Sequence, residues 1–462
     1  MFSFQQRLKY LVRFLLLVIL GAAYVMIAHA ETPPLSMDGA IRLAVQTNLT
    51  TQLSKATSKE ARGRAIQAAA SLLPQVTGSV SQARVLKANL AAEGFEATSF
   101  LPNPIIGPYN VFDARFTLVQ KILDMNSIWS TKAASADVQV AQYAEDLAAE
   151  QVASAAALAY IEDLRAIQGV RDAQANLDLA EKLATLAHHQ HDAGLATGVD
   201  TARAETRVAH DRQRLIQARL AATQADIRLK RVVGIPLAEP LALVEPQVSS
   251  SPAVIGGGSI NGRIDSRPET AENDGFITKA LSDRPEIHIT EAEVKAETYG
   301  LGAARAGYLP VVSATADYGF SGNLPDGSAR TGSIGGRLDF PIFSGGLTDG
   351  QVQEAKGRQA AAQSQFEDTR IQVEEDVRLA LQTLSAEVDD VAAAETELKL
   401  AETELQFSQD RYSSGVGDNI QVVTAQTALE DARQSLIDVR ARHADARANL
   451  AMALGHMQTF EL

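Results

Sequence analysis

Two stretches of the sequence decide the fold: Ala204–Gly234, AETRVAHDRQRLIQARLAATQADIRLKRVVG, and Ala425–Gly455, AQTALEDARQSLIDVRARHADARANLAMALG. When they are aligned without a gap, so that Ala204 falls on Ala425, they agree at 10 of 31 positions. Gly194 falls on Gly415 in the same alignment, named here the repeat alignment. Self-similarity at a fixed distance is the signature of a repeat architecture. The chain is therefore predicted to be two tandem copies of one unit.

The boundaries of the two copies follow from the repeat alignment. We predict a first repeat over 31–239, a connector over 240–275 and a second repeat over 276–462. The connector is rich in Pro, Gly and Ser, a composition that favours loops over helices or strands.

Both aligned stretches carry a helical seam. Starting at Ala204 and at Ala425, apolar residues recur at alternating steps of four and three, interrupted only by Asp211 and His443. This heptad spacing is typical of coiled coils. Upstream of each stretch, about 70 residues run without a helix-breaking proline, enough for a helix of about 105 Å. Each copy is therefore predicted to contain one very long helix, a glycine loop and a returning helix.

The segments before each long helix alternate with a period of two, which is typical of strands. The predicted strands cover about 75–87, 109–121, 311–322 and 332–343. Each has one apolar face and one polar face, and each is near the 9–11 residues that cross an outer membrane. A half-buried strand of a soluble protein would show the same alternation. The residues expected to face a water-filled barrel lumen are Asp113, Arg115, Asp317, Arg337 and Asp339.

Four such strands cannot close a barrel alone, and open sheet edges are not tolerated in lipid. Several chains must therefore pool their strands. Three chains would supply about twelve and two about eight, both even numbers. The sequence does not choose between them.

The N-terminus has the three parts of a secretory signal peptide. Arg7, Lys9 and Arg13 precede an apolar run over 14–28, and Ala28 and Ala30 form a cleavage pattern. This predicts a signal peptide over 1–30. The remaining chain has 39 basic and 56 acidic residues, a net charge of −17, which argues against nucleic-acid binding. The absence of cysteine excludes disulfides, thiolate metal sites, a catalytic Cys and a lipid-bearing Cys.

No catalytic motif is present. The sequence has no Gly-x-Ser-x-Gly elbow and no His-Glu-x-x-His helix, and Gly256–Gly258 lacks the Lys-Ser/Thr of a phosphate loop. His188 and His191 are better explained as a solvated helix end than as a metal site. We therefore expect neither enzymatic activity nor a cofactor or bound metal.

Several short motifs, in this order along a doubled chain, resemble the TolC family of outer-membrane factors. They are Ser282–Ile287 (SDRPEI), Tyr308–Pro310 (YLP), Phe340–Gly346 (FPIFSGG) and Arg411–Gly415 (RYSSG). At the first strand-to-helix junction, Lys121 stands where the family has proline. The resemblance covers nearly all of the mature sequence.

The resemblance implies a mainly α fold with a membrane β-barrel contribution. Each repeat would comprise a helix, two strands, a very long helix and a returning helix. Three chains would form a trimeric α-barrel/β-barrel tunnel across the outer membrane and periplasm. The loops at Gly194 and Gly415 would be a periplasmic tip, closed at rest and opened by a periplasmic adaptor.

The predicted function is the outer-membrane exit duct of a tripartite export system, a passive conduit for small molecules. Its partners would be sister chains, outer-membrane lipid, a periplasmic adaptor (membrane fusion) protein and an inner-membrane pump or ABC transporter. The alternative is the outer-membrane component of ABC-driven type I protein secretion. A periplasmic adaptor or a structural coiled coil is a further rival.

Residues near the two loops are candidates for a gate, because a pore-facing Asp becomes a ring of carboxylates in a trimer. Capping of helix ends would explain the same residues. The double acidic ring common after the family's second tip is replaced here by Gln421 and Thr424, and Gly417 stands where an arginine often occurs. The gate candidates are Asp192, Asp200, Tyr412 and Asp418.

Overall fold

The computed structural model describes residues 34–89, 105–244, 254–255, 258–259, 270–414 and 416–461. The predicted signal peptide, most of the connector and Gly415 lie outside the described residues.

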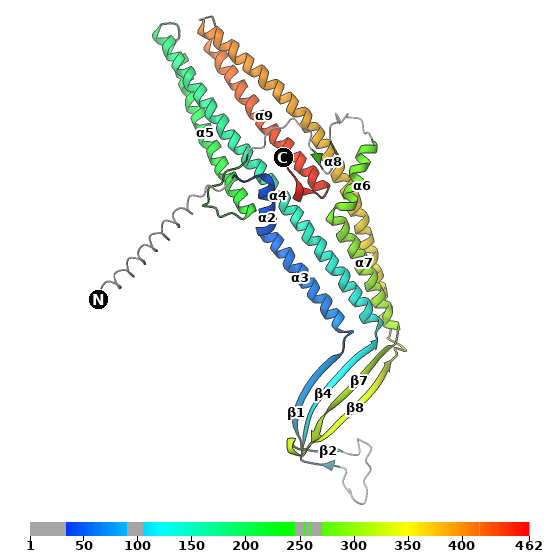
Figure 1. The fold of residues 1–462 in the computed structure, drawn as a ribbon. Coiled ribbons are helices and arrows are strands. Elements are labelled where there is room, and N and C mark those ends of the chain that lie inside the picture. The colour runs from blue at the N-terminus through cyan, green and yellow to red at the C-terminus, as the bar shows by residue number, and fades with distance from the viewer. Residues whose placement is uncertain are drawn as a thin grey trace, which may run out of the picture.

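The two repeats have the same order of elements (Figure 1), which confirms the predicted mainly α, tandem-repeat fold class. The first repeat contains α2 (Met37–Thr47), α3 (Leu49–Ala70), β1 (Gln75–Val85), β4 (Tyr109–Leu123), α4 (Met125–Asp192) and α5 (Gly198–Val233). The second contains α6 (Thr270–Asp283), α7 (Pro285–Arg305), β7 (Val311–Gly322), β8 (Ala329–Asp339), α8 (Leu347–Ser413) and α9 (Asn419–Ala453). The two-residue strands β2 (Ala88–Asn89) and β3 (Ile105–Ile106) pair with each other, as do β5 (Val254–Ile255) and β6 (Gly258–Ser259).

Several boundaries differ from the sequence prediction, including the end of β1, which lies at Val85 rather than at 87. β8 runs from Ala329 to Asp339 rather than over 332–343, because Pro341 has no N–H to donate to a ladder. β4 continues to Leu123, and α6 starts at Thr270, inside the segment predicted as connector. Short strands also form within that connector.

The repeat extends to the three-dimensional structure. In the repeat alignment, the last residue of α4, Asp192, falls on the last residue of α8, Ser413, and the first residues of α5 and α9 likewise coincide. Buried residues recur at aligned positions, which shows that both hairpins pack through the same seam. The buried pairs are Ala180/Ala401, Ala184/Leu405, Ala204/Ala425, Leu215/Leu436, Ala225/Ala446 and Leu229/Leu450.

The long helices form a single curved layer in the order α5, α4, α9, α8 (Figure 1). α4 and α9 lie in the middle of the layer, and α5 and α8 lie at its two edges. Toward the strands, α3 and α7 replace the returning helices as neighbours of α4 and α8. Among the described residues, no helix combines the length and the hydropathy needed to cross a lipid bilayer.

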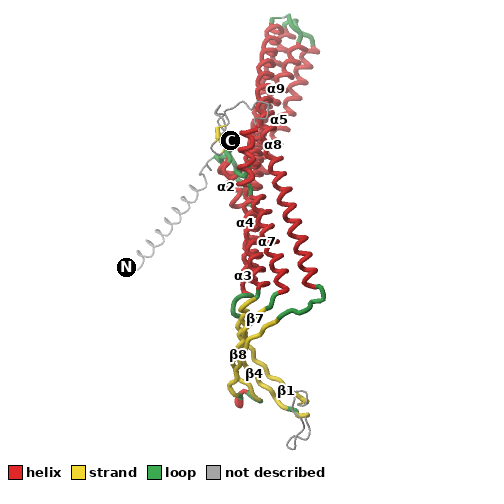
Figure 2. The backbone as a smooth tube through the Cα atoms, turned by 90° about the vertical axis from the view of Figure 1, so that its right-hand side faces the viewer, coloured by secondary structure: helices red, strands yellow, loops and turns green. Residues whose placement is uncertain are grey.

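The four long strands form one antiparallel sheet in the order β1-β4-β7-β8, at the end opposite the glycine loops (Figure 2). β1 and β8 are its edges. Each strand is connected along the chain to a helix of the layer, β4 to α4 through one residue and β8 to α8 through the loop 340–346, so the sheet continues the helical layer rather than packing against it.

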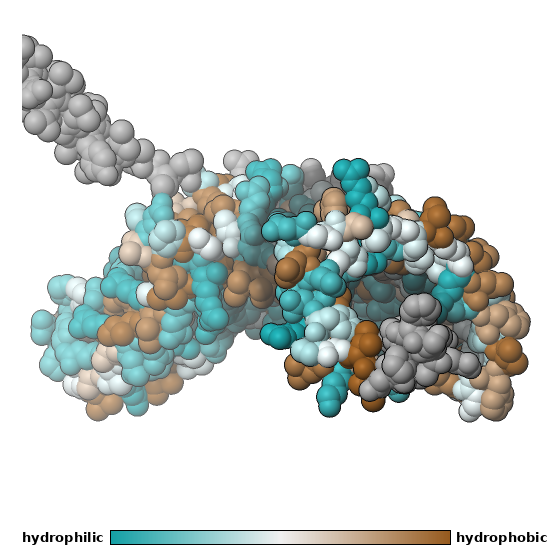
Figure 3. Space-filling view, turned by 90° about the horizontal axis from the view of Figure 1, so that it is seen from below, coloured by the Kyte–Doolittle hydropathy of each residue, from teal (hydrophilic) through white to brown (hydrophobic). Residues whose placement is uncertain are grey.

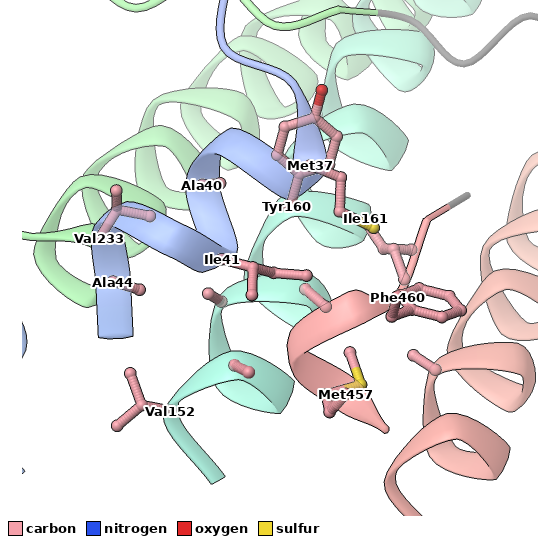
Figure 4. Close-up of a cluster of buried hydrophobic side chains, with 14 of the residues drawn as sticks. Met37, Ala40, Ile41, Ala44, Val152, Tyr160, Ile161, Val233, Met457 and Phe460 are labelled. Carbon is pink, nitrogen blue, oxygen red and sulfur yellow. The ribbon is translucent and has the colours of Figure 1, made fainter. Parts of the chain in front are cut away.

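A hydrophobic cluster midway along the helices packs α2 and the residues near the C-terminus against α4 and α5 (Figure 4). Met37 and Ile41 of α2, Tyr160 of α4, Val233 of α5 and Phe460 near the C-terminus meet there, and all are buried. The Tyr160 hydroxyl donates to either of two carbonyl oxygens, Leu35 O at 2.9 Å and Val244 O at 2.7 Å. Tyr160 thereby holds the segment before α2 beside the segment that follows α5.

Tyr160→Phe is expected to lower the free energy of unfolding by about 1 kcal/mol, because two partly buried carbonyl oxygens lose the Tyr160 hydroxyl as a donor. Limited proteolysis should cleave more readily near Leu35 and Val244. The control is Tyr308→Phe, whose exposed hydroxyl bonds Asp349 and whose loss should have a smaller effect. Equal losses of stability in the two variants would contradict the role of the Tyr160 hydroxyl in holding these two segments together.

Candidate functional site

The two faces of the sheet have opposite character. The strand register places Asp113, Arg115, Thr117, Asp317 and Ser333 on one face. Arg115 binds Asp113 and reaches Asp317 on the neighbouring strand at 3.0 Å, and Ser333 donates to Asp317. The structure therefore brings three of the five predicted lumen residues into one network. The other two, Arg337 and Asp339, lie on the same face, 3.6 Å from each other and exposed.

The other face of the sheet is apolar and uncovered. Val76, Phe116, Tyr318 and Ile334 are 65%, 67%, 57% and 89% exposed. Seen from the strand end (Figure 3), hydrophobic residues gather along the outer rim of the molecule. Soluble monomers rarely expose contiguous apolar patches of this kind, so this face is suited to contact lipid or another apolar surface.

The four gate candidates lie together around the two loops, but in different environments. Asp192 at the end of α4 is exposed. Asp200 accepts from the backbone N–H and the hydroxyl of Thr197, which lowers the pKa of its carboxyl. Asp418 caps α9 by accepting from Ile420 N at 3.1 Å. Two of the three aspartates therefore cap helices, as the alternative interpretation predicts.

Tyr412 joins the two hairpins at the tip. Its side chain is buried, and its hydroxyl has no hydrogen-bond partner among the described residues. Burial raises the pKa of Tyr412, and Asp200 and Asp418 raise it further. Gln190 of α4 donates to the Tyr412 carbonyl at 3.1 Å, and Asn419 donates to the Asp200 carbonyl at 3.1 Å.

The loop beside Tyr412 requires glycine for space. A Cβ at Gly417 would lie 2.9 Å from Tyr412 N and 3.0 Å from the carbonyl carbon of Arg411. In this conformation the loop therefore does not accommodate an arginine at position 417. The nearby cation Arg203 lies 3.8 Å from Asp200.

Two turns above the tip, buried charges connect α5 and α9. The set comprises Arg207, Asp211, Arg214, Gln426 and Glu430, named here the cross-hairpin network. Arg207 binds Asp211 at 3.1 Å and also binds Glu430, and Arg214 reaches Glu430 at 2.6 Å. The side chains of Asp211 and Glu430 are only 1% and 2% exposed. Two cations balance two anions, so the buried group is nearly neutral.

Sequence reasoning missed this network except for one signal. Asp211 interrupts an apolar stripe, and a charged residue at a seam position needs a buried partner. Its cationic partner, Arg207, lies four residues earlier on the same helix, but Glu430, which binds Arg207 and Arg214, lies in the other repeat and could not be identified from the sequence. A groove of about 630 Å³ lies beside the network, between α5 and α9, and is lined by Val199, Arg203, Thr206, His210 and Ile420 among others.

A second buried charge lies midway along α4. Asp163 is 3% exposed, and burial raises the pKa of its carboxyl to about 6, with Asp226 adding to the shift and Lys230 opposing it. The folded chain therefore binds a proton more tightly than the unfolded chain. Stability must fall as the pH rises from about 4 to about 6, and the destabilisation is complete above that window.

Asp163→Asn is expected to raise the free energy of unfolding by about 2 kcal/mol at pH 8, because it removes the buried charge. At pH 4 the gain should nearly vanish, since Asp163 is then protonated. Thermal unfolding at both pH values measures the difference. Asp178→Asn, at an exposed position of the same helix, is the control. A gain that does not depend on pH would contradict this assignment.

The chain is similar to known proteins in both sequence and structure. The chain matches the family described as outer membrane efflux protein over residues 40–235 and 276–456, which are the two repeats. It is 28% identical over 295 residues to the probable efflux pump outer membrane protein TtgC of Pseudomonas putida, covering 60% of this chain. That alignment spans 54%, about half, of the relative's own length.

Other relatives match over a larger share of this chain and of their own length. The pyoverdine export outer membrane protein OpmQ of Pseudomonas aeruginosa is 24% identical over 407 residues, covering 86% of this chain and 80% of that protein. The crystal structure of the outer membrane protein VceC from Vibrio cholerae superposes with a TM-score of 0.76 at 19% identity, covering 91% of this chain and 96% of that one. The last similarity shows the shared fold.

Proposed function

Because the chain belongs to the outer membrane efflux protein family, we propose that it is the outer-membrane exit channel of a tripartite export system. It resides in the outer membrane, as the names of its relatives state for them, and its long helices extend into the periplasm. It provides a passive path, and an inner-membrane pump supplies the energy.

One observation carries this proposal: a four-stranded sheet with an uncovered apolar face and two open edges continues directly into a layer of long helices. Lipid is the environment that favours such an apolar face. In lipid, unpaired edge groups are costly, so β8 of one chain must pair with β1 of another. Three chains would close a barrel of about twelve strands, an even number.

In the closed barrel, the polar face of the sheet lines the water-filled path. Arg115 pairs with both Asp113 and Asp317, so this part of the lining carries two carboxylates for one guanidinium, a net charge of −1. Arg337 and Asp339, exposed near the other edge, would add weakly paired charges to the lumen. Such charges tune ion preference.

The helical ends opposite the sheet form the gate. Tyr412 carries a buried hydroxyl without a partner among the described residues, at the place where the two hairpins meet, so a rearrangement of the hairpins would change the surroundings of this hydroxyl. Asp192, Asp200 and Asp418 would each recur three times around the entrance. An adaptor hairpin would dock into the groove between α5 and α9 and favour the open arrangement.

The proposed cargo is small molecules rather than proteins. The relatives named above include an efflux pump component and a pyoverdine export protein. This favours drug or metabolite efflux over type I protein secretion.

The proposal is tested on the full-length protein purified in detergent. Mass measurement should give a trimer, and addition to a planar lipid bilayer should give discrete conductance steps. Tyr412→Phe should raise the open fraction if its hydroxyl holds the gate shut. A monomer that stays dissolved without detergent, or a trimer that never conducts even as Tyr412→Phe, would contradict the channel.

A further inference from the structure

The cross-hairpin network joins two helices that are not neighbours in the layer of long helices. α4 lies between α5 and α9 (Figure 1), so the connection depends on long side chains. Arg207 of α5 donates to the Thr427 hydroxyl at 3.0 Å and binds one carboxylate oxygen of Glu430. Arg214 binds the other carboxylate oxygen of Glu430 at 2.6 Å. Glu430 thereby holds α9 to two arginines of the first hairpin.

The network is not part of the internal repeat. In the repeat alignment, each of its four charged residues falls on a small uncharged residue. The aligned pairs are Arg207/Ala428, Asp211/Ala432, Arg214/Ser435 and Glu430/Ala209. The apolar seam is nevertheless kept, since Leu215 and its equivalent Leu436 are both buried. A hairpin can therefore form its seam without these charges, which indicates that they serve the contact between the two hairpins.

Burial makes this contact sensitive to the separation of the hairpins. The side chains of Asp211 and Glu430 are almost completely buried, and that of Arg207 is 12% exposed. Removing the partner of a buried charge is strongly unfavourable as long as water stays out. A small displacement of α9 from α5, which lengthens the ion pairs without admitting water, is therefore opposed.

A larger displacement is less costly, because water can then replace the lost partners. Arg207 lines the groove between α5 and α9, and the side chain of Arg214 is already 47% exposed. Both guanidinium groups can therefore be hydrated once Glu430 has moved away, and hydration offsets the loss of an ion pair. The network thus favours two discrete arrangements, one joined and buried, the other separated and hydrated.

At the tip itself, the hydrogen bonds between the hairpins are neutral. Gln190 donates to the Tyr412 carbonyl at 3.1 Å. Asn419 donates to the Asp200 carbonyl, also at 3.1 Å. The Tyr412 hydroxyl has no partner within the described ranges. Because a charge-assisted hydrogen bond is roughly twice as strong as a neutral one, the network is the stronger connection between α5 and the second hairpin.

We propose that the cross-hairpin network is a lock that holds the closed arrangement of the helices. The second hairpin, formed by α8 and α9, moves away from α5 only after Glu430 has released Arg207 and Arg214. Asp211 keeps Arg207 in position at 3.1 Å, so the lock can form again when α9 returns. The inference rests on the proposed function. It specifies which contacts must break when the channel opens, and these contacts lie above the tip rather than at the tip.

The natural absence of cysteine allows the lock to be removed and then restored. Arg214→Cys and Glu430→Cys are introduced together into the full-length chain, which removes one cation and one anion and leaves Arg207 paired with Asp211. In planar lipid bilayers, the open fraction of the unlinked 214/430 variant should be at least about tenfold that of the parent. A short bis-maleimide then joins the two positions, and the open fraction should return to the parent's level or below it.

The matched control is Glu395→Cys with Arg440→Cys. These residues also form an ion pair, at 2.9 Å, but both lie in the second hairpin, on α8 and α9. Removing this pair, or joining the two positions, leaves α9 free to separate from α5. The open fraction should therefore match that of the parent before and after cross-linking. Peptide mass measurement shows whether each pair has been joined within one chain.

Glu430→Gln tests the lock without cysteine. It keeps the size of the side chain and its capacity to accept hydrogen bonds but removes the negative charge. Its open fraction should be at least about threefold that of the parent, because the bonds from both arginines lose half of their charge assistance. Glu395→Gln should open no more often than the parent. If the 214/430 variant does not assemble as a trimer, the comparison of these two variants decides.

Failure of the lock and failure of the channel give different results. An unlinked 214/430 variant that conducts no more often than the parent overturns the lock and leaves the channel intact. The same holds for a cross-linked 214/430 variant that conducts as often as the unlinked one, and for a control pair whose cross-linking closes the channel equally. If neither the parent nor any variant conducts, linked or unlinked, the channel is contradicted and the lock with it.

Discussion

Glu430→Ala is expected to lower the free energy of unfolding by about 3–5 kcal/mol, the usual cost of removing one partner from a buried ion pair. Glu430 binds both Arg207 and Arg214 across the two hairpins. Its removal leaves the nearly buried Arg207 with Asp211 as its remaining charged partner, and the cross-hairpin network with a net positive charge. Denaturant unfolding of the protein in detergent, followed by helical circular dichroism, measures the loss.

The matched control is Glu395→Ala. Glu395 also binds an arginine of α9, Arg440 at 2.9 Å, but both side chains are 53% exposed. Exposed pairs contribute about 0–1 kcal/mol, so this variant should unfold almost as the parent does. If both variants lost the same stability, the network would not hold the hairpins together.

Gly319→Ala is expected to abolish assembly of the sheet. A Cβ at Gly319 of β7 would lie 2.2 Å from the Ala114 carbonyl oxygen and 2.5 Å from Arg115 Cα. These are backbone atoms of the paired strand, so β4 and β7 would have to separate. At least a tenfold loss of trimer is expected, measured by mass in detergent and by conductance in lipid bilayers.

Gly336→Ala, in the edge strand β8, is the control for this variant. A Cβ there meets no atom within 4 Å, and alanine fits a strand better than glycine does. Trimer yield should therefore match that of the parent chain. If Gly319→Ala also assembled normally, the close pairing of β4 and β7 would be wrong.

The sequence predicted the repeated elements because their signals are local. The four-and-three spacing that starts at Ala204 and Ala425 identifies the buried seam, and the structure buries both residues. The period-two segments identify the strands in the same way. These patterns depend only on residues a few positions apart.

The sequence did not show which helices are neighbours in the layer. Glu430 occupies an ordinary position on α9, and only the layer order places it beside Arg207 of α5. At the tip, Asp200 and Asp418 were predicted as gate candidates, and the structure shows both bonded to helix starts. Helix capping and gating both use aspartate in such a loop, so the gating role of Asp200 and Asp418 stays a prediction that conductance measurements would test.

The uninterrupted course of α4 has a mechanical consequence. Its 68 residues join the sheet to the tip as one rod of about 100 Å, at 1.5 Å per residue. Pivoting that rod by only about one degree where it leaves the sheet would displace its far end by roughly 2 Å, simply through its length. In the proposed channel, an aperture at that end can therefore widen by ångströms while the strands stay almost still.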